Sequence, residues 1–69
     1  MERTAVTSSN IASVGYEAET MTLEIEFNNG RVYQYQGVPQ EVYEALIQAG
    51  SKGSYFNANI KNSYSCTRL

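Results

Sequence analysis

The sequence predicts an α+β fold: a three-stranded antiparallel β-meander followed by two short helices packed on one face of the sheet. Three observations support this prediction. Residues 21–27 alternate strictly between apolar and polar side chains, residues 28–30 interrupt the alternation, and residues 42–49 carry apolar side chains at helical spacing. Strands joined by short turns pair in antiparallel fashion, and the helical stripe needs a sheet face against which it can be buried.

The first two strands are expected at residues 10–16 and 21–27. In the first, Ile11, Val14 and Tyr16 alternate weakly with small residues. In the second, every other residue is apolar, which means that one face of the strand is buried. These apolar residues are Met21, Leu23, Ile25 and Phe27.

The turn at residues 28–30 decides which way the tyrosines of the third strand, residues 31–36, point. A two-residue loop places Tyr33 and Tyr35 on the outer face of the sheet, whereas a three-residue loop with Gly30 in the left-handed conformation places both on the inner face. We favour the three-residue loop because each aromatic ring gains a large burial free energy. Both tyrosines are therefore expected to be mostly buried.

Two helices are expected after the sheet. Pro39 suits the first position of a helix, and Gly50 is expected to end that helix in the left-handed conformation. Ser51 is then expected to cap a second short helix. The expected core consists of Ile11, Val14, Leu23, Ile25, Phe27, Val42, Leu46, Phe56 and Ile60.

The chain is expected to form one domain at residues 9–65, with a disordered segment at residues 1–8 and a tail at residues 66–69. Its 69 residues are close to the lower limit for folding on a single core. The sequence contains neither an apolar run long enough to span a membrane nor the apolar segment of a signal peptide. Its single cysteine, Cys66, excludes a disulfide scaffold and fits the reducing conditions of the cytoplasm.

Nothing in the sequence indicates an enzyme, a cofactor or a metal site. The absence of histidine removes histidine-dependent nucleophiles and imidazole-ligated zinc. Glu24 and Glu26 share one face of a strand, which we interpret as a solvated surface rather than as an acid–base pair or a Mg²⁺ site. Cys66 alone is interpreted as an inert thiol.

Two groups of residues are candidates for binding RNA or another anion. Tyr33 and Tyr35 suit stacking on unpaired bases, if their rings are exposed. The segment at residues 51–54, between the two helices, offers backbone N–H groups, a serine hydroxyl and Lys52 to a phosphate. The structural interpretations, core packing for the tyrosines and a capped linker for the segment, are favoured at both places.

The charge is distributed unevenly along the chain. Residues 1–50 contain seven glutamates and two arginines, a net −5, whereas residues 51–69 contain Lys52, Lys61 and Arg68 and no acid, a net +3. Such asymmetry is one indication of an end that faces a polyanion, although a small chain also acquires it by chance.

Together these motifs resemble the KTSC domain family over residues 9–64. The resemblance rests on the alternating strand with Gly30, on Tyr33-x-Tyr35, and on the later motifs Val38-Pro39, Ser51-Lys52-Gly53 and Tyr55-Phe56-Asn57. This family occurs at the C-terminus of some lysyl-tRNA synthetases and as a free-standing bacterial protein. The resemblance implies a small cytoplasmic protein of a bacterium or phage, and RNA binding as the function suggested for the family.

Two functions are therefore carried forward. The first is a small non-enzymatic RNA-binding module, in which the RNA contact runs mainly through the two lysines and is weak. Its candidate residues are Tyr33, Tyr35, Ser51, Lys52, Gly53 and Lys61. The alternative is a protein–protein interaction or self-association module, because tyrosine is enriched in binding patches and the chain has six tyrosines. RNA binding requires the cations to gather on one face, away from the glutamates.

Overall fold

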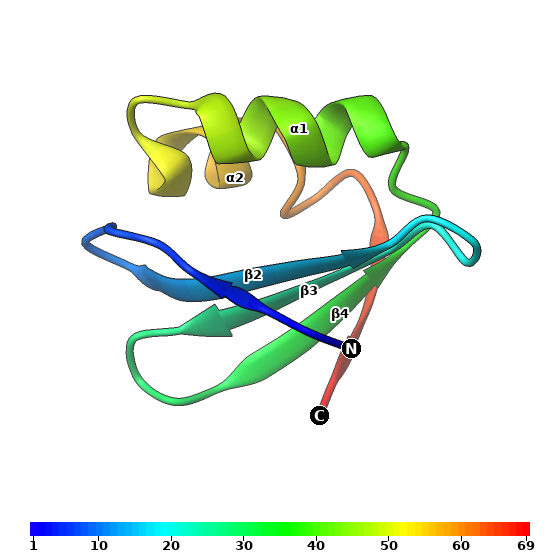
Figure 1. Cartoon of the computed structure of the whole chain (residues 1–69), viewed down its shortest axis with the longest axis horizontal. Helices are drawn as coiled ribbons and strands as arrows, with labels where there is room; N and C mark the ends of the chain where they lie inside the picture. Colours follow the sequence, from blue (N-terminus) through cyan, green and yellow to red (C-terminus); the bar gives the residue numbers. More distant parts are fainter.

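The structure, a computed structural model, describes all residues 1–69 and contains one sheet covered by two helices (Figure 1). The strands and helices, in chain order, are β1 (Thr4–Ala5), β2 (Ile11–Glu17), β3 (Thr22–Phe27), β4 (Val32–Gln36), α1 (Gln40–Gln48), α2 (Lys52–Asn59) and β5 (Ser65–Arg68). All neighbouring strands are antiparallel, in the order β1-β2-β3-β4-β5. Both helices lie on the same face, here called the inner face, which confirms the α+β prediction.

The sheet has five strands instead of the three expected. β1 pairs with β2, and β5 pairs with β4, so the first and last residues, which the sequence placed outside the domain, extend the sheet at its two edges. Both edge strands are short and fully exposed, and neither shows an apolar alternation. Backbone hydrogen bonding holds them, and this interaction leaves no periodic signal in the sequence.

The hairpin between β3 and β4 has the expected three-residue loop. The Gly30 N–H donates to the Phe27 carbonyl at 2.9 Å, the Phe27 N–H donates to the Arg31 carbonyl at 2.8 Å, and Gly30 has φ of 87°. This loop sets the register in which Tyr35 lies opposite Leu23. The predicted inner-face position of the tyrosines is therefore confirmed.

The core contains most of the expected residues, with four differences. Phe27 and Val42 are only half-buried and pack at its border, whereas Tyr35 and Val38 are fully part of it. Tyr33 is half-buried, less than expected, and it lies two residues nearer the β3–β4 loop than Tyr35 does. The buried apolar residues are Ile11, Val14, Leu23, Ile25, Tyr35, Val38, Leu46, Phe56 and Ile60.

The junction between the two helices differs from the prediction in its backbone. α1 ends at Gln48; its C-cap residue Ala49 is extended, with φ of −66° and ψ of 139°, and Gly50 has no positive φ. Pro39 precedes the helix as its N-cap instead of occupying the first helical position. Ser51 does cap α2 as expected, because its hydroxyl accepts from the Ser54 N–H.

The outer face of the sheet holds a polar network where the sequence predicted a solvated surface. Glu24 is only 5% exposed, and it accepts hydrogen bonds from Arg3 and from Gln34. Arg3 also donates to Ser13, whose hydroxyl donates to Glu26. The segment before β1 can lie against this face because Gly15 has no side chain: a Cβ atom there would be 2.6 Å from the carbonyl oxygen of Glu2.

The carboxyl group of Glu24 is expected to make stability depend on pH. Burial raises its pKa, but the hydrogen bonds from Gln34 and Arg3 and the charge of Arg3 outweigh burial, so that the pKa lies below the ordinary value of 4.5. A lowered pKa in the folded state stabilises the fold above pH 4.5, and this stabilisation is lost as the pH falls through the folded-state pKa.

Replacing Arg3 with alanine is expected to lower the free energy of unfolding by ~1–2 kcal/mol at pH 7, because a buried carboxylate loses a charged donor. The acid-induced loss of stability should also become shallower. Urea unfolding at pH 7 and at pH 3 measures both effects. Arg31→Ala is the control, since Arg31 is exposed and its side chain makes no hydrogen bond or ion pair. Equal stability of the two variants at pH 7 would contradict the proposed role of Arg3.

Candidate functional site

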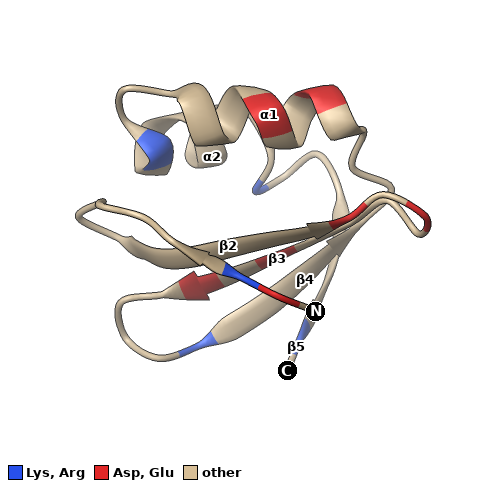
Figure 2. Cartoon of the chain, in the orientation of Figure 1, with Lys and Arg blue, Asp and Glu red and all other residues tan.

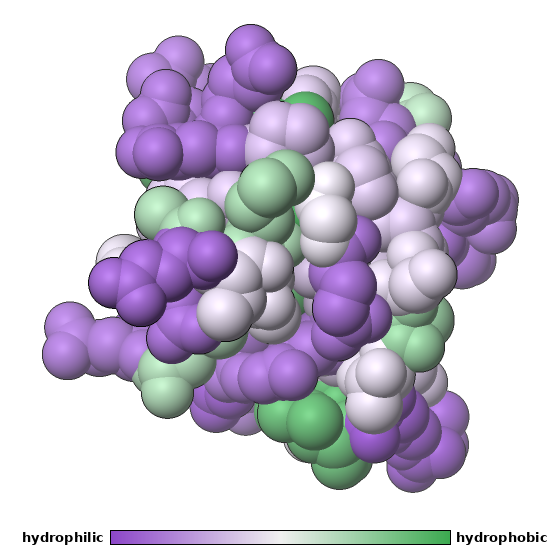
Figure 3. Space-filling view, turned by 90° about the vertical axis from the view of Figure 1, so that its right-hand side faces the viewer, coloured by the Kyte–Doolittle hydropathy of each residue, from purple (hydrophilic) through white to green (hydrophobic).

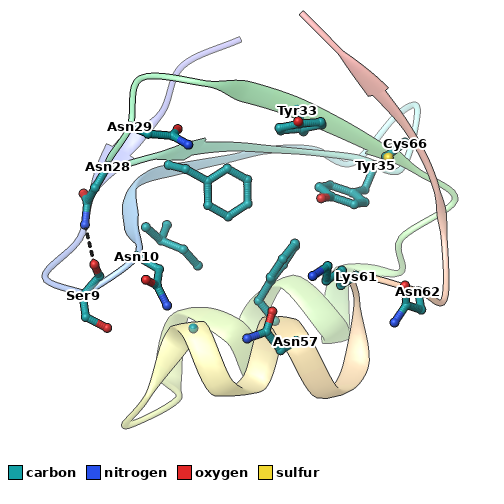
Figure 4. Close-up of a pocket in the computed structure, with 14 residues that line it drawn as sticks. Ser9, Asn10, Asn28, Asn29, Tyr33, Tyr35, Asn57, Lys61, Asn62 and Cys66 are labelled. Atoms are coloured by element: carbon teal, nitrogen blue, oxygen red, sulfur yellow. Dashed lines mark hydrogen bonds between the residues drawn. The ribbon is translucent and has the colours of Figure 1, made fainter.

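The larger of two hollows in the structure lies between α2 and the inner face of the sheet (Figure 4). Its volume is about 620 Å³, and it is open to solvent along one side. Aromatic side chains from β3, β4 and α2 line much of it. They are Phe27, Tyr33, Tyr35 and Phe56. We call this hollow the aromatic cleft.

The four rings hold one another in edge-to-face contacts. The ring centre of Phe56 is 5.4 Å from that of Phe27 and 5.4 Å from that of Tyr35, with interplanar angles of 68° and 77°. Phe27 meets Tyr33 at 5.8 Å and 78°. Edge-to-face pairs of this kind stabilise a fixed arrangement beyond the gain from burial alone. The cleft is therefore preformed.

The hydroxyl of Tyr35 is the polar group deepest in this aromatic set. The residue is 4% exposed, and its oxygen points into the cleft (Figure 4). It makes no hydrogen bond to the protein, although Tyr16, another tyrosine of the inner face, donates to the Val38 carbonyl at 2.6 Å. Burial, together with Cys66 and Tyr33, raises the pKa of Tyr35 to about 12. The hydroxyl is neutral at pH 7 and can both donate and accept.

Asparagine side chains surround the cleft. Two have structural roles: Asn28 donates to the Ser8 and Ser9 carbonyls, and the side-chain oxygen of Asn29 accepts from the Arg31 N–H. The other three carboxamides make no hydrogen bond to the protein. They belong to Asn10, Asn57 and Asn62.

A glycine makes room for one of these carboxamides. A Cβ atom on Gly53 would lie 3.1 Å from Nδ2 of Asn10, which is closer than most such contacts in proteins. Because α2 has glycine there, the helix can approach the start of β2 and the amide fits between them. Of the motif Ser51-Lys52-Gly53, only the glycine lines the cleft, where it leaves space for the side chain of Asn10.

Positive charge predominates around the cleft although the whole chain has a net charge of −2. No carboxylate lines it, and Lys61 is its one charged residue. Arg68 lies opposite Tyr33 in the register, and Arg31 is two residues before Tyr33, so both belong to the inner face as well. Figure 2 shows the acidic positions elsewhere, on α1, at the β2–β3 turn, in β3 and near the N-terminus.

The structure separates the candidate residues that the sequence grouped together. Tyr33, Tyr35, Gly53 and Lys61 line the aromatic cleft, whereas Ser51 and Lys52 line the second hollow, of about 330 Å³, which has no apolar residue. The ammonium of Lys52 donates to the Ala49 carbonyl at 3.2 Å. Lys52 therefore satisfies a carbonyl group at the end of α1. It does not form a phosphate site together with the backbone N–H groups at the start of α2.

Several residues of the cleft were not identified from the sequence as site residues. Asn57 was named only as part of a family motif, and Phe27 and Phe56 were expected only in the core. Arg68 was noted only as one of the three positively charged residues of the C-terminal segment, and its position in the fold was not predicted. The sequence signal that was available is Tyr55-Phe56-Asn57, in which a buried ring is followed directly by a polar residue on α2.

Other kinds of site find no counterpart in the structure. No group of three or more Cys, Asp or Glu side chains is arranged to hold a metal ion, and none of the helices is long and apolar enough to cross a membrane. Cys66 is exposed at the border of the cleft, opposite Tyr35.

These features define a small α+β domain with one preformed aromatic cleft rimmed by amides. The chain belongs to the KTSC domain family, whose family model matches residues 7–64. The family resemblance of the sequence motifs is thereby confirmed.

Relatives of the chain include both free-standing proteins and parts of an enzyme. A KTSC domain protein from Yersinia pestis, known from its crystal structure, is 39% identical, with a TM-score of 0.94 over 99% of this chain and 96% of that one. An uncharacterised protein from Stutzerimonas stutzeri is 46% identical over 88% of this chain and 86% of its own length. A lysine–tRNA ligase from Nostoc punctiforme is also 46% identical over 88% of this chain, but the match covers 11% of the ligase.

Proposed function

We propose that this domain is a non-enzymatic binding module for unpaired RNA and that the aromatic cleft is its contact surface. The composition of the cleft carries the proposal: aromatic rings, free carboxamides and a lysine, with no carboxylate, in an acidic chain. Single-stranded RNA is bound in proteins by the stacking of bases on aromatic side chains beside cationic groups. The related segment within lysine–tRNA ligases supports the same proposal, because those enzymes are named for a tRNA substrate.

The phosphate contacts are assigned to Lys61, Arg31 and Arg68. These three cations share the inner face with the cleft, whereas Lys52 is turned toward the end of α1. Three contacts on a single strand give a salt slope of about −2 in a plot of log affinity against log salt concentration. The glutamates elsewhere on the surface repel the same backbone, so binding is expected to be weak at physiological salt and measurable at low salt.

Lys61→Gln is expected to weaken binding of an unstructured fluorescent RNA and to lower the salt slope by about 0.7, the contribution of one phosphate contact. Fluorescence anisotropy at salt concentrations from about 20 to about 200 mM measures both quantities. Over this tenfold range a slope of about −2 changes the affinity about a hundredfold. Lys52→Gln is the matched control, because it removes the same charge from the second hollow. Absence of binding by the wild-type protein at low salt, or an equal effect of both substitutions, would overturn the proposal.

Self-association is the second candidate, and the free edge of β5 favours it. β5 pairs only with β4, and all four of its residues are exposed. Such an edge can pair with a second strand. The tyrosines do not form the docking surface expected from their number, since none of the six is exposed.

The apolar surface gives self-association little further support. The exposed large apolar residues are Met1, Met21 and Leu69, and the face drawn in Figure 3 shows apolar residues only as separate patches. Sedimentation equilibrium of the wild-type protein tests this candidate independently of RNA. A dimer that persists in a Cys66→Pro variant would exclude β5 pairing, because the Cys66 N–H faces away from β4 and proline removes this donor of the free edge.

The RNA-binding function would place the protein in the cytoplasm, where RNA and tRNA ligases are found. The single exposed thiol, Cys66, is compatible with that reducing compartment.

A further inference from the structure

The hydroxyl of Tyr35 limits which groups can fill the inner end of the cleft. Nearly all of the tyrosine is buried, yet its oxygen faces the open space and has no protein partner. No buried polar side-chain atom of the protein lacks a partner, so this oxygen is open to solvent and is hydrated in the free protein. A ligand that displaces this water loses affinity unless it replaces the hydrogen bond. A ligand that fills the cleft must therefore offer a donor or an acceptor at its inner end.

Two free carboxamides face the same space from different elements. Asn10 precedes β2, and Asn57 lies on α2 (Figure 4). A carboxamide presents a donor and an acceptor side by side, which matches the edges of nucleobases, where donors and acceptors are adjacent. Neither amide is used by the fold, so both are available to a ligand.

The size and charge of the cleft limit the ligand to a small planar group. Its volume of about 620 Å³ lies in the range of small-molecule pockets, and Phe27, Tyr33 and Phe56 provide apolar and aromatic walls. The absence of carboxylates disfavours a cation. The single Lys61, beside aromatic walls, disfavours a buried phosphate, which usually needs several donors or arginines.

We propose that the aromatic cleft takes one nucleobase, whose edge is recognised by Tyr35, Asn10 and Asn57 while its phosphate stays outside near Lys61. The inference rests on the proposed RNA binding and names the part of the RNA that enters the protein. A free nucleotide presents the same base, so the test must distinguish the two sources.

The first experiment compares two fluorescent RNA eight-mers that differ only in whether the central nucleotide carries a base. Wild-type protein is expected to bind the base-bearing RNA roughly 5- to 150-fold more tightly than the abasic RNA, the effect of one base stacked on an aromatic side chain. Tyr35→Phe, which keeps the ring and removes the hydroxyl, should weaken binding of the base-bearing RNA roughly five-fold, the effect of one hydrogen bond. Its affinity for the abasic RNA should not change.

Asn57→Ala should produce a similar loss, and its matched control is Asn59→Ala on the same helix. The Asn59 side chain donates to the Tyr55 carbonyl and does not line the cleft. Asn59→Ala is therefore expected to bind both RNAs as the wild-type protein does. Equal losses in the two variants would overturn the role of Asn57.

The second experiment uses Cys66 as a reporter, since its thiol is exposed and lines the cleft. Each nucleoside monophosphate in turn is added during alkylation by iodoacetamide, with ribose 5-phosphate as the control that lacks a base. At least one nucleotide should slow alkylation in the wild-type protein and do so less in Tyr35→Phe, while ribose 5-phosphate should have no effect.

The outcomes separate this inference from the proposed function. Equal affinity for the two RNAs, with no protection of Cys66, would overturn the base site and leave RNA binding in place. Protection by a nucleotide without any RNA binding at low salt would support the base site and overturn the RNA-binding function. Neither binding nor protection would overturn both.

Discussion

Replacing Tyr35 with alanine is expected to lower the free energy of unfolding by about 3–5 kcal/mol, as other aromatic-to-alanine changes in cores do. The ring is 4% exposed and packs edge-to-face against Phe56. A domain of this size rarely has more than about 3–5 kcal/mol of net stability from its core. Urea unfolding followed by circular dichroism should therefore show a variant that is largely unfolded without denaturant. A loss below about 1 kcal/mol would contradict the core position of this ring.

Tyr35→Phe is the control, because it keeps the ring and should retain most of the stability at pH 7. The two proteins should differ at high pH. The pKa of Tyr35 is raised to about 12 in the folded state, so its contribution is present below the ordinary value of 10 and is lost as the pH rises from 10 toward 12. Stability of the wild-type protein should thus fall more steeply over this range than stability of Tyr35→Phe.

The central strands could be predicted in detail because their signals are strong and agree. The alternation of residues 21–27 identifies the buried face of β3, and Gly30 then determines the side on which Tyr33 and Tyr35 lie. A loop one residue shorter would have reversed both tyrosines. Burial of aromatic rings was sufficient to choose between these loops, and the structure confirms the choice.

The edges of the sheet and its outer face could not be predicted because no local pattern specifies them. β1 and β5 are polar, and they are held by backbone pairing with strands that are distant in sequence. Glu24 follows the pattern of a solvated residue, and only the return of Arg3 across the outer face buries it. Contacts of this kind depend on the tertiary fold and not on the periodicity of a segment.

The candidate site was predicted in part, for a similar reason. Tyr33, Tyr35, Gly53 and Lys61 were identified from composition and motifs, and all four line the cleft. The carboxamides of the cleft come from separate elements, and asparagine is so common in turns and at helix ends that a single one carries little information. The direction of Lys52 depends on the extended end of α1, which a glycine at position 50 did not indicate.

Replacing Phe56 with alanine is the second change expected to have a large effect, again about 3–5 kcal/mol. Phe56 contacts the rings of both Phe27 and Tyr35, and through these contacts α2 packs against β3 and β4. Within α2 the only other buried residue is Gly53, which has no side chain, and the next buried anchor is Ile60 at the C-cap. Loss of this ring should therefore loosen α2 and open the aromatic cleft. Urea unfolding measures the loss of stability.

A double-mutant cycle isolates the contact between the rings of Phe56 and Tyr35. Leucine in place of each aromatic residue keeps the domain folded more readily than alanine, and the coupling free energy should be about 0.5–1.5 kcal/mol, the usual strength of an edge-to-face pair. The control cycle pairs Tyr35→Leu with Tyr43→Leu, because Tyr43 stacks on Tyr16 at 4.9 Å and has no ring contact with Tyr35. These two changes should add within about 0.5 kcal/mol. Equal coupling in the two cycles would mean that Phe56 stabilises the domain by filling space, and that the rings lining the cleft do not hold one another in place.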